Sequence, residues 1–88
     1  MDGRELVAWN LRRLRVKTGL SQEKLAVDAG LDRTYVGGIE RAIENPTVAV
    51  LDRLAEALEI QVSALLKEPR RGSTRPKPLR GGRRARLK

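Results

Sequence analysis

The sequence has no cysteine, no histidine and no phenylalanine, and it contains one tryptophan and one tyrosine in 88 residues. Without cysteine there can be no disulfide or thiolate metal site. The additional lack of histidine removes the other ligand that zinc prefers, so we expect no metal. Because aromatic side chains are so few, aliphatic residues must fill the core. A chain of this length forms one domain at most, with a small interior.

Long apolar runs and catalytic side-chain combinations are also missing. No run approaches the length of a membrane-spanning helix, and residues 1–20 lack the apolar core of a signal peptide. We therefore expect a soluble, cytoplasmic protein with no membrane partner. No nucleophile–base pair and no glycine-rich phosphate loop after a strand can be identified, and the carboxylates are dispersed. The sequence thus argues against an enzyme, a catalytic residue, a cofactor or a small-molecule ligand.

The positive charge is concentrated at one end of the chain. Residues 1–68 hold ten Lys/Arg and eleven Asp/Glu, a net charge of −1, whereas residues 69–88 hold nine Lys/Arg and no acid. Residues 69–88 also carry three prolines and three glycines without apolar periodicity, a composition that cannot bury enough surface to become ordered. We predict a folded domain, 1–68, and a disordered basic tail, 69–88. The tail either adds non-specific phosphate contacts through counterion release or merely raises solubility.

Apolar spacing predicts an all-α domain of five helices. The first covers residues 3–18, with Asp2 as its cap, Gly19 at its end and an inward seam of Val7, Leu11 and Leu14. The fourth follows a Thr47 cap and has the most regular seam in the chain, formed by Leu51, Leu54, Ala55 and Leu58. A short fifth helix is expected at about 61–67.

The pattern of capping residues and glycine in residues 21–40 predicts two short helices joined by a tight turn. Ser21 and Asp32 have the short polar side chains that cap helix starts, and Gly30 can adopt the left-handed conformation that ends a helix. Two helices of about eight residues with a glycine-containing turn between them are typical of the helix-turn-helix, whose second helix enters the major groove of DNA.

This stretch, SQEKLAVDAGLDRTYVGGIE, resembles the phage repressor/Cro-type helix-turn-helix. It is similar in particular to the controller proteins of restriction–modification systems, in which an Asp-Arg-Thr-Tyr opening to the second helix is familiar. The resemblance implies a buried ion pair between Arg15 and Glu40, and a Gln22 that contacts phosphate and braces the recognition helix. The chain departs from the family pattern where Ala42 and Glu59 replace the usual glycines.

The recognition helix, residues 32–41, is expected to meet base edges with its first exposed side chains, Arg33, Thr34 and Tyr35. Arg33 can donate two hydrogen bonds to guanine. Tyr35 could instead stack on the sugar-phosphate backbone, read a deformable base step or be partly buried. Family members often place base-reading side chains at the positions of Gly37 and Gly38. We expect the bare backbone at Gly38 to approach the bases closely, with DNA shape supplying part of the specificity. Predicted phosphate contacts are Gln22, Arg41, Asn45 and Arg12, although Arg12 could equally be an ordinary solvated residue.

Apolar residues of the fifth helix exceed what a small core can hold, so we predict a two-fold dimer interface formed by Val62, Leu65 and Leu66. The predicted function is a dimeric, sequence-specific transcriptional regulator that binds a pseudo-palindromic operator in double-stranded DNA, in the nucleoid. The resemblance implies control of a restriction–modification operon, including the regulator's own promoter. Contact with RNA polymerase through exposed acids stays open.

Other functions remain open at this point. Within the same class, the chain could be a phage-type repressor or a toxin–antitoxin regulator. From other classes come an RNA-binding or chromatin-like accessory protein driven by the basic tail, and a protein-interaction module built on the helix-turn-helix scaffold. The acidic balance of residues 1–68 keeps the alternatives from other classes open. Glu44, in a loop that often carries basic residues in the family, is expected to oppose phosphate binding there.

Overall fold

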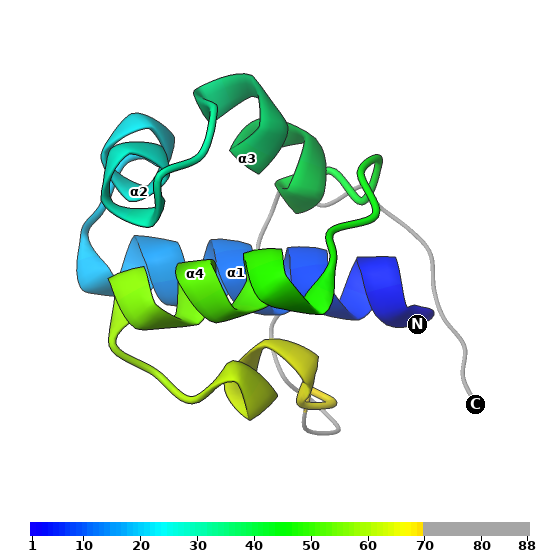
Figure 1. The fold of residues 1–88 in the computed structure, drawn as a ribbon. Helices are drawn as coiled ribbons and strands as arrows, with labels where there is room; N and C mark the ends of the chain where they lie inside the picture. Colours follow the sequence, from blue (N-terminus) through cyan, green and yellow to red (C-terminus); the bar gives the residue numbers. More distant parts are fainter. Residues whose placement is uncertain (70–88) are drawn as a thin grey trace.

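The computed structural model describes residues 1–69, which form four α-helices and one 3-10 helix. They are α1 (Gly3–Thr18), α2 (Gln22–Ala29), α3 (Arg33–Glu40), α4 (Val48–Leu58) and η1 (Val62–Leu66). In Figure 1, α2 and α3 lie on one side of α1 and α4, and η1 lies on the other. Within residues 1–69 there is no strand, which confirms the all-α helix-turn-helix architecture, and no helix has the length and apolarity to cross a membrane.

The fifth element differs from the prediction. It is a single stretch of 3-10 helix five residues long, without a side-chain cap at Gln61. Short segments favour the tighter 3-10 turn because they contain too few residues to establish an α-helix. Of the predicted tail, residues 69–88, only Pro69 is described, so the prediction for the tail lies outside the described part of the chain.

Helix ends lie where the capping residues predict them. The Asp2 carboxylate accepts a hydrogen bond from the Glu5 amide at 2.9 Å, and the Glu5 carboxylate accepts one from the Asp2 amide at 3.0 Å. This reciprocal arrangement satisfies two amides that a helix start leaves free. Ser21 and Asp32 cap α2 and α3 in the predicted way, through the amides of residues 24 and 34. Gly30 ends α2 with a φ of 70°, the left-handed turn between the two helices.

Two residues with side chains adopt the left-handed conformation at the predicted glycine replacements. Ala42 has a φ of 61° and Glu59 a φ of 59°. Both follow the ends of helices, where the chain must reverse direction. A Cβ in this region is crowded by the backbone, so each position carries a conformational cost that glycine avoids.

Glu59→Gly is therefore expected to stabilise the domain by about 0.5 to 1 kcal/mol, because relief of the left-handed strain outweighs the added freedom of the unfolded chain. Urea unfolding followed by circular dichroism measures this change. Glu59→Ala removes the same charge but keeps a Cβ, and it serves as the matched control. Equal midpoints for the two variants would show that charge, rather than backbone strain, causes any gain.

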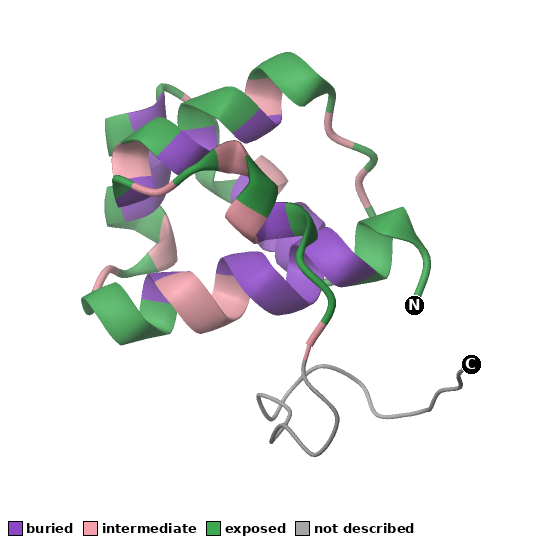
Figure 2. Ribbon diagram, turned by 90° about the horizontal axis from the view of Figure 1, so that it is seen from below, coloured by how far each residue is buried: buried purple, intermediate pink, exposed green. Residues whose placement is uncertain are grey.

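The core is aliphatic and joins all five elements. Figure 2 shows the buried residues on the inward sides of the helices and the exposed ones on the outer turns. The predicted seam of α4 is buried in full, at Leu51, Leu54, Ala55 and Leu58. Leu65 of η1 also belongs to this cluster and is 0% exposed. The prediction that Leu65 lines a dimer interface is therefore wrong, since its side chain is fully used inside one chain.

Asn10 of α1 holds η1 in place through hydrogen bonds, a contact that the sequence did not predict. It is buried, and its side-chain amide nitrogen lies 3.1 Å from the Leu65 carbonyl oxygen and 2.9 Å from that of Lys67. A third carbonyl, that of Leu6, lies at 3.0 Å. The available signal was a polar residue within the apolar seam of α1, between Val7 and Leu14.

Asn10→Ala is expected to destabilise the domain by about 2 to 3 kcal/mol, because carbonyls on the inner side of η1 lose their donor in a buried setting. The free energy of unfolding in urea provides the measurement. Asn10→Asp offers a sharper comparison, since it keeps the shape but replaces the donor by an acceptor facing the same carbonyls. A loss below about 0.5 kcal/mol for both variants would contradict the anchoring role.

Candidate nucleic-acid interface

α3 has one buried and one exposed side. Val36 and Ile39 point into the core, where they are 0% and 1% exposed. Arg33 and Thr34, in the first turn, are exposed, and Tyr35 is half-buried against the core cluster. The two residues predicted to meet base edges first are thus displayed at the N-terminal end of the helix, the end with which recognition helices dock.

The orientation of α3 depends on a buried carboxylate. Glu40 is 2% exposed, and Arg15 of α1 reaches it with two donors, at 2.6 Å from Nε to Oε2 and 3.1 Å from Nη2 to Oε1. Gln22 of α2 donates to Glu40 Oε1 at 3.0 Å. One carboxylate therefore connects α1, α2 and α3, and this arrangement fixes the angle at which α3 projects from the domain.

Some of the predicted phosphate contacts lie within this network. Besides Gln22, Arg12 has its Nη1 at 3.6 Å from Glu40 Oε1, and its side chain is only 27% exposed. Arg12 thus has a structural partner that the sequence did not predict. Arg41 and Asn45 are exposed, at the end of α3 and in the following loop. The residues predicted to hold phosphate therefore divide into two that brace α3 and two that face solvent.

The space beside Gly37 and Gly38 in α3 is filled by side chains from other parts of the same chain. A Cβ built on Gly37 would lie 3.3 Å from Arg41 Nη1 and 3.7 Å from Gln22 Oε1. A Cβ built on Gly38 would lie 2.6 Å from Glu44 Cγ. Both glycines are consequently buried. The expectation that the bare Gly38 backbone faces the bases is corrected, because the Glu44 side chain covers it.

In the described part of the chain, some of the exposed cationic side chains around α3 are already bound in ion pairs, and others are free to bind a ligand. Lys24 of α2 is paired with Asp28 at 2.9 Å. Arg33 and Arg41, in contrast, take part in no ion pair within residues 1–69. Two unpaired guanidinium groups at opposite ends of an eight-residue helix suit an elongated anionic ligand, since Arg can donate paired hydrogen bonds both to phosphate oxygens and to a guanine edge.

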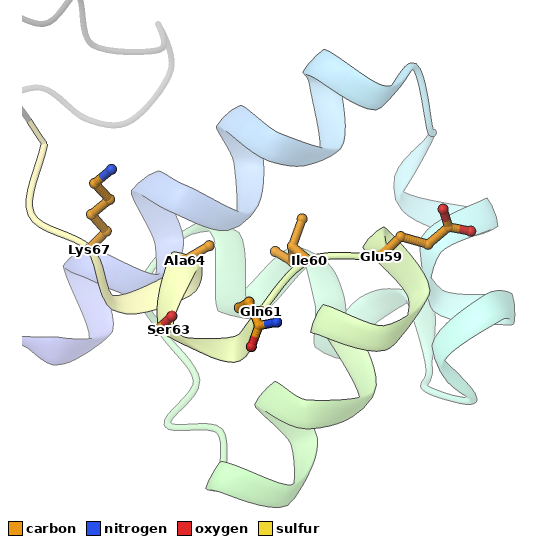
Figure 3. A pocket seen from close by; sticks show the side chains of 6 residues that line it. All are labelled: Glu59, Ile60, Gln61, Ser63, Ala64 and Lys67. Atoms are coloured by element: carbon orange, nitrogen blue, oxygen red, sulfur yellow. The ribbon is translucent and has the colours of Figure 1, made fainter.

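A second surface lies beside η1, on the side of the domain opposite to α3. Glu59, Ile60, Gln61, Ser63, Ala64 and Lys67 line a depression there (Figure 3). Of the predicted interface residues, Leu66 is 46% exposed and Val62 is half-buried. The described residues contain no cluster of acidic side chains that could hold a metal ion.

Comparison with known proteins matches residues 11–65 to the helix-turn-helix family. The control protein C.SmaI of Serratia marcescens is 47% identical over 66 residues, which cover 75% of this chain and 79% of that protein. A hypothetical transcription factor of Neisseria meningitidis is 43% identical over 68 residues, which cover 77% of this chain and 64% of that protein. The crystal structure of the restriction-modification controller protein C.AhdI from Aeromonas hydrophila superposes with a TM-score of 0.69 at 45% identity, covering 70% of this chain and 94% of that one.

Proposed function

The chain belongs to the helix-turn-helix family of DNA-binding transcriptional regulators, and from this we propose that it binds a two-fold symmetric operator as a homodimer. In this proposal α3 enters the major groove. The proposal rests on one observation about α3. Glu40 at its C-terminal end is bound by Arg15 and Gln22, which holds the helix in place, while Arg33 and Thr34 at its N-terminal end are exposed. A rigidly held helix presents its side chains to base edges in one geometry, which sequence reading requires.

Individual contacts follow from this placement. Arg33 donates to guanine O6 and N7, and Thr34 contacts a thymine methyl or a base edge with its hydroxyl. Tyr35 is half-buried and contacts the sugar-phosphate backbone with its exposed part. Arg41 and Asn45 hold phosphates on the flank, while Gln22 and Arg12 contribute through the bracing of α3.

The surface beside η1 is proposed as the dimer interface. Leu66 of η1 is exposed, whereas Val62 of η1 and the preceding Ile60 are partly buried against the core. η1 lies on the far side of α1 and α4 from α3 (Figure 1). A two-fold axis through this surface leaves both copies of α3 free. Paired recognition helices about 34 Å apart then reach successive major grooves on one face of the duplex.

Control of a restriction–modification operon is the proposed biological role, supported by similarity to proteins named as control proteins, C.SmaI and C.BamHI of Bacillus amyloliquefaciens. The regulated genes then include the regulator's own promoter. RNA polymerase is proposed as a further partner through exposed acids such as Glu23 and Asp52.

The test is selection of bound duplexes from a random DNA pool with the full chain, at about 150 mM salt to suppress contacts that depend on charge alone. A two-fold symmetric consensus with half-sites about one helical turn apart supports the proposal. Sedimentation equilibrium of the wild-type chain and of Leu66→Asp tests the interface, since a charge at this position is expected to shift the protein toward monomer. Retention of DNA without a consensus contradicts the operator proposal.

The charge distribution favours one alternative, a non-specific nucleic-acid accessory protein driven by the basic tail. Residues 1–68 carry a net charge of −1, and the nine Lys/Arg that make the chain cationic follow them. Removal of residues 70–88 leaves the described core intact and separates the two functions. An operator-binding protein keeps its consensus and loses mainly salt-dependent affinity, whereas a tail-driven protein loses binding altogether.

A further inference from the structure

Gly38 lies in the middle of the outward stripe of α3. Thr34, Gly38 and Arg41 recur at i, i+4 and i+7, on the side of the helix opposite to Val36 and Ile39. A side chain at position 38 would therefore stand between those of Thr34 and Arg41, on the surface that the proposed function places in the major groove. Glycine offers no functional group at this position.

Glu44 fills the space that this missing side chain leaves. Against a Cβ built on Gly38, Glu44 Cγ would lie at 2.6 Å, Cδ at 3.4 Å and Oε2 at 3.2 Å. Any residue other than glycine at position 38 would displace the Glu44 side chain. The absence of a side chain at Gly38 thus makes room for Glu44, and the Glu44 carboxylate lies on the outward surface of α3.

The loop that carries Glu44 is held against α3 by its backbone. The amides of Ile43 and Glu44 both donate to the Gly38 carbonyl oxygen, at 2.9 Å and 3.2 Å. The left-handed Ala42, with a φ of 61°, turns the chain back toward the helix. Because the Glu44 backbone is bonded to the residue that its side chain covers, the position of the carboxylate is defined by local geometry.

The Glu44 carboxylate has unused hydrogen-bonding capacity. Within residues 1–69 it takes part in no ion pair and no side-chain hydrogen bond, and Glu44 is only partly buried. An ionised carboxylate accepts hydrogen bonds and repels phosphate. In the major groove its matching donor is an exocyclic amino group, and cytosine N4 is the partner that Asp and Glu side chains take.

We propose that Glu44 is a specificity-determining residue that lies over Gly38, supplies α3 with an acceptor and selects cytosine through its N4 amino group. This inference rests on the proposed function, since it requires α3 in the major groove. The same charge lowers affinity where no amino group is presented to it, so Glu44 increases discrimination between operator and other DNA.

Parallel selections from one random duplex pool test the inference with the full-length wild type, Glu44→Gln and Glu44→Ala. The wild type is expected to prefer cytosine at one position of each half-site by about 5- to 100-fold, the range of one good base contact. Glu44→Ala is expected to lose that preference. Glu44→Gln is expected to shift it toward adenine, because a side-chain amide can both accept from N6 and donate to N7 of that base.

Two further variants serve as controls. Gly38→Ala is expected to reproduce the Glu44→Ala consensus, since the added Cβ pushes the carboxylate away, and circular dichroism verifies that the variant is folded. Glu56→Gln makes the same charge change at an exposed position of α4, outside the two proposed surfaces, and is expected to leave the consensus unchanged.

Three results would overturn the inference. In the first, the wild-type consensus persists at every position in both Glu44 variants. In the second, the variants bind all duplexes more tightly by one common factor, which would reduce Glu44 to a repulsive charge. In the third, the wild type yields no consensus, which refutes the proposed function itself and the inference with it.

Discussion

Glu40→Ala is expected to lower the free energy of unfolding by about 3 to 5 kcal/mol. The substitution leaves the Arg15 guanidinium buried without its anion and removes the acceptor of Gln22. Small domains have total stabilities of about 5 to 15 kcal/mol, so this loss is enough to unfold a large fraction of the protein near physiological temperature. Urea unfolding, followed by circular dichroism, measures it.

The double variant Arg15→Met, Glu40→Leu provides the control. It removes both charges and keeps the volume of the side chains, so no uncompensated ion remains, and most of the stability is expected to return. Glu56→Ala, an exposed acid on α4, is expected to change stability by less than about 0.5 kcal/mol. A double variant as unstable as the two single changes added together would contradict a coupled pair.

Arg33→Ala is expected to cause the largest loss of DNA discrimination. One bidentate contact with guanine contributes about 5- to 100-fold for each half-site, and a dimer has two, so the preference for operator over unrelated DNA is expected to fall by the square of that factor. Non-specific affinity should change little, because it depends on phosphate contacts made elsewhere. Competition binding with operator and scrambled duplexes at fixed salt measures both quantities.

Arg33→Lys distinguishes base reading from charge. Lysine keeps the positive charge but lacks the planar pair of donors, so it should leave non-specific affinity unchanged and restore only part of the discrimination. If Arg33→Ala weakened operator and scrambled DNA equally, Arg33 would be a phosphate contact and the reading of guanine would be refuted. Because Arg33 is exposed and takes part in no ion pair within residues 1–69, neither substitution should affect stability by more than about 0.5 kcal/mol.

The four α-helices, their ends and their buried sides could be predicted from the amino-acid sequence alone. Caps such as Asp2 and Ser21, the left-handed Gly30 and the apolar spacing of α4 act over three or four residues, so they are readable without a structure. The helix-turn-helix follows from the same local signals. The Arg15–Glu40 pair could be expected only from the family resemblance, because its partners lie 25 residues apart.

Which polar groups meet and which apolar residues stay exposed depends on the three-dimensional packing of the chain. Asn10 meets the carbonyl of Leu65 across 55 positions, and the neighbouring Leu66 remains on the surface. Spacing within a five-residue 3-10 helix cannot predict that difference. Likewise, the sequence predicts a Gly38 backbone that is open to the bases, yet the chain turns back at Ala42 and places Glu44 over it. Such contacts depend on how loops and helices pack in three dimensions, and no periodicity in the sequence records that packing.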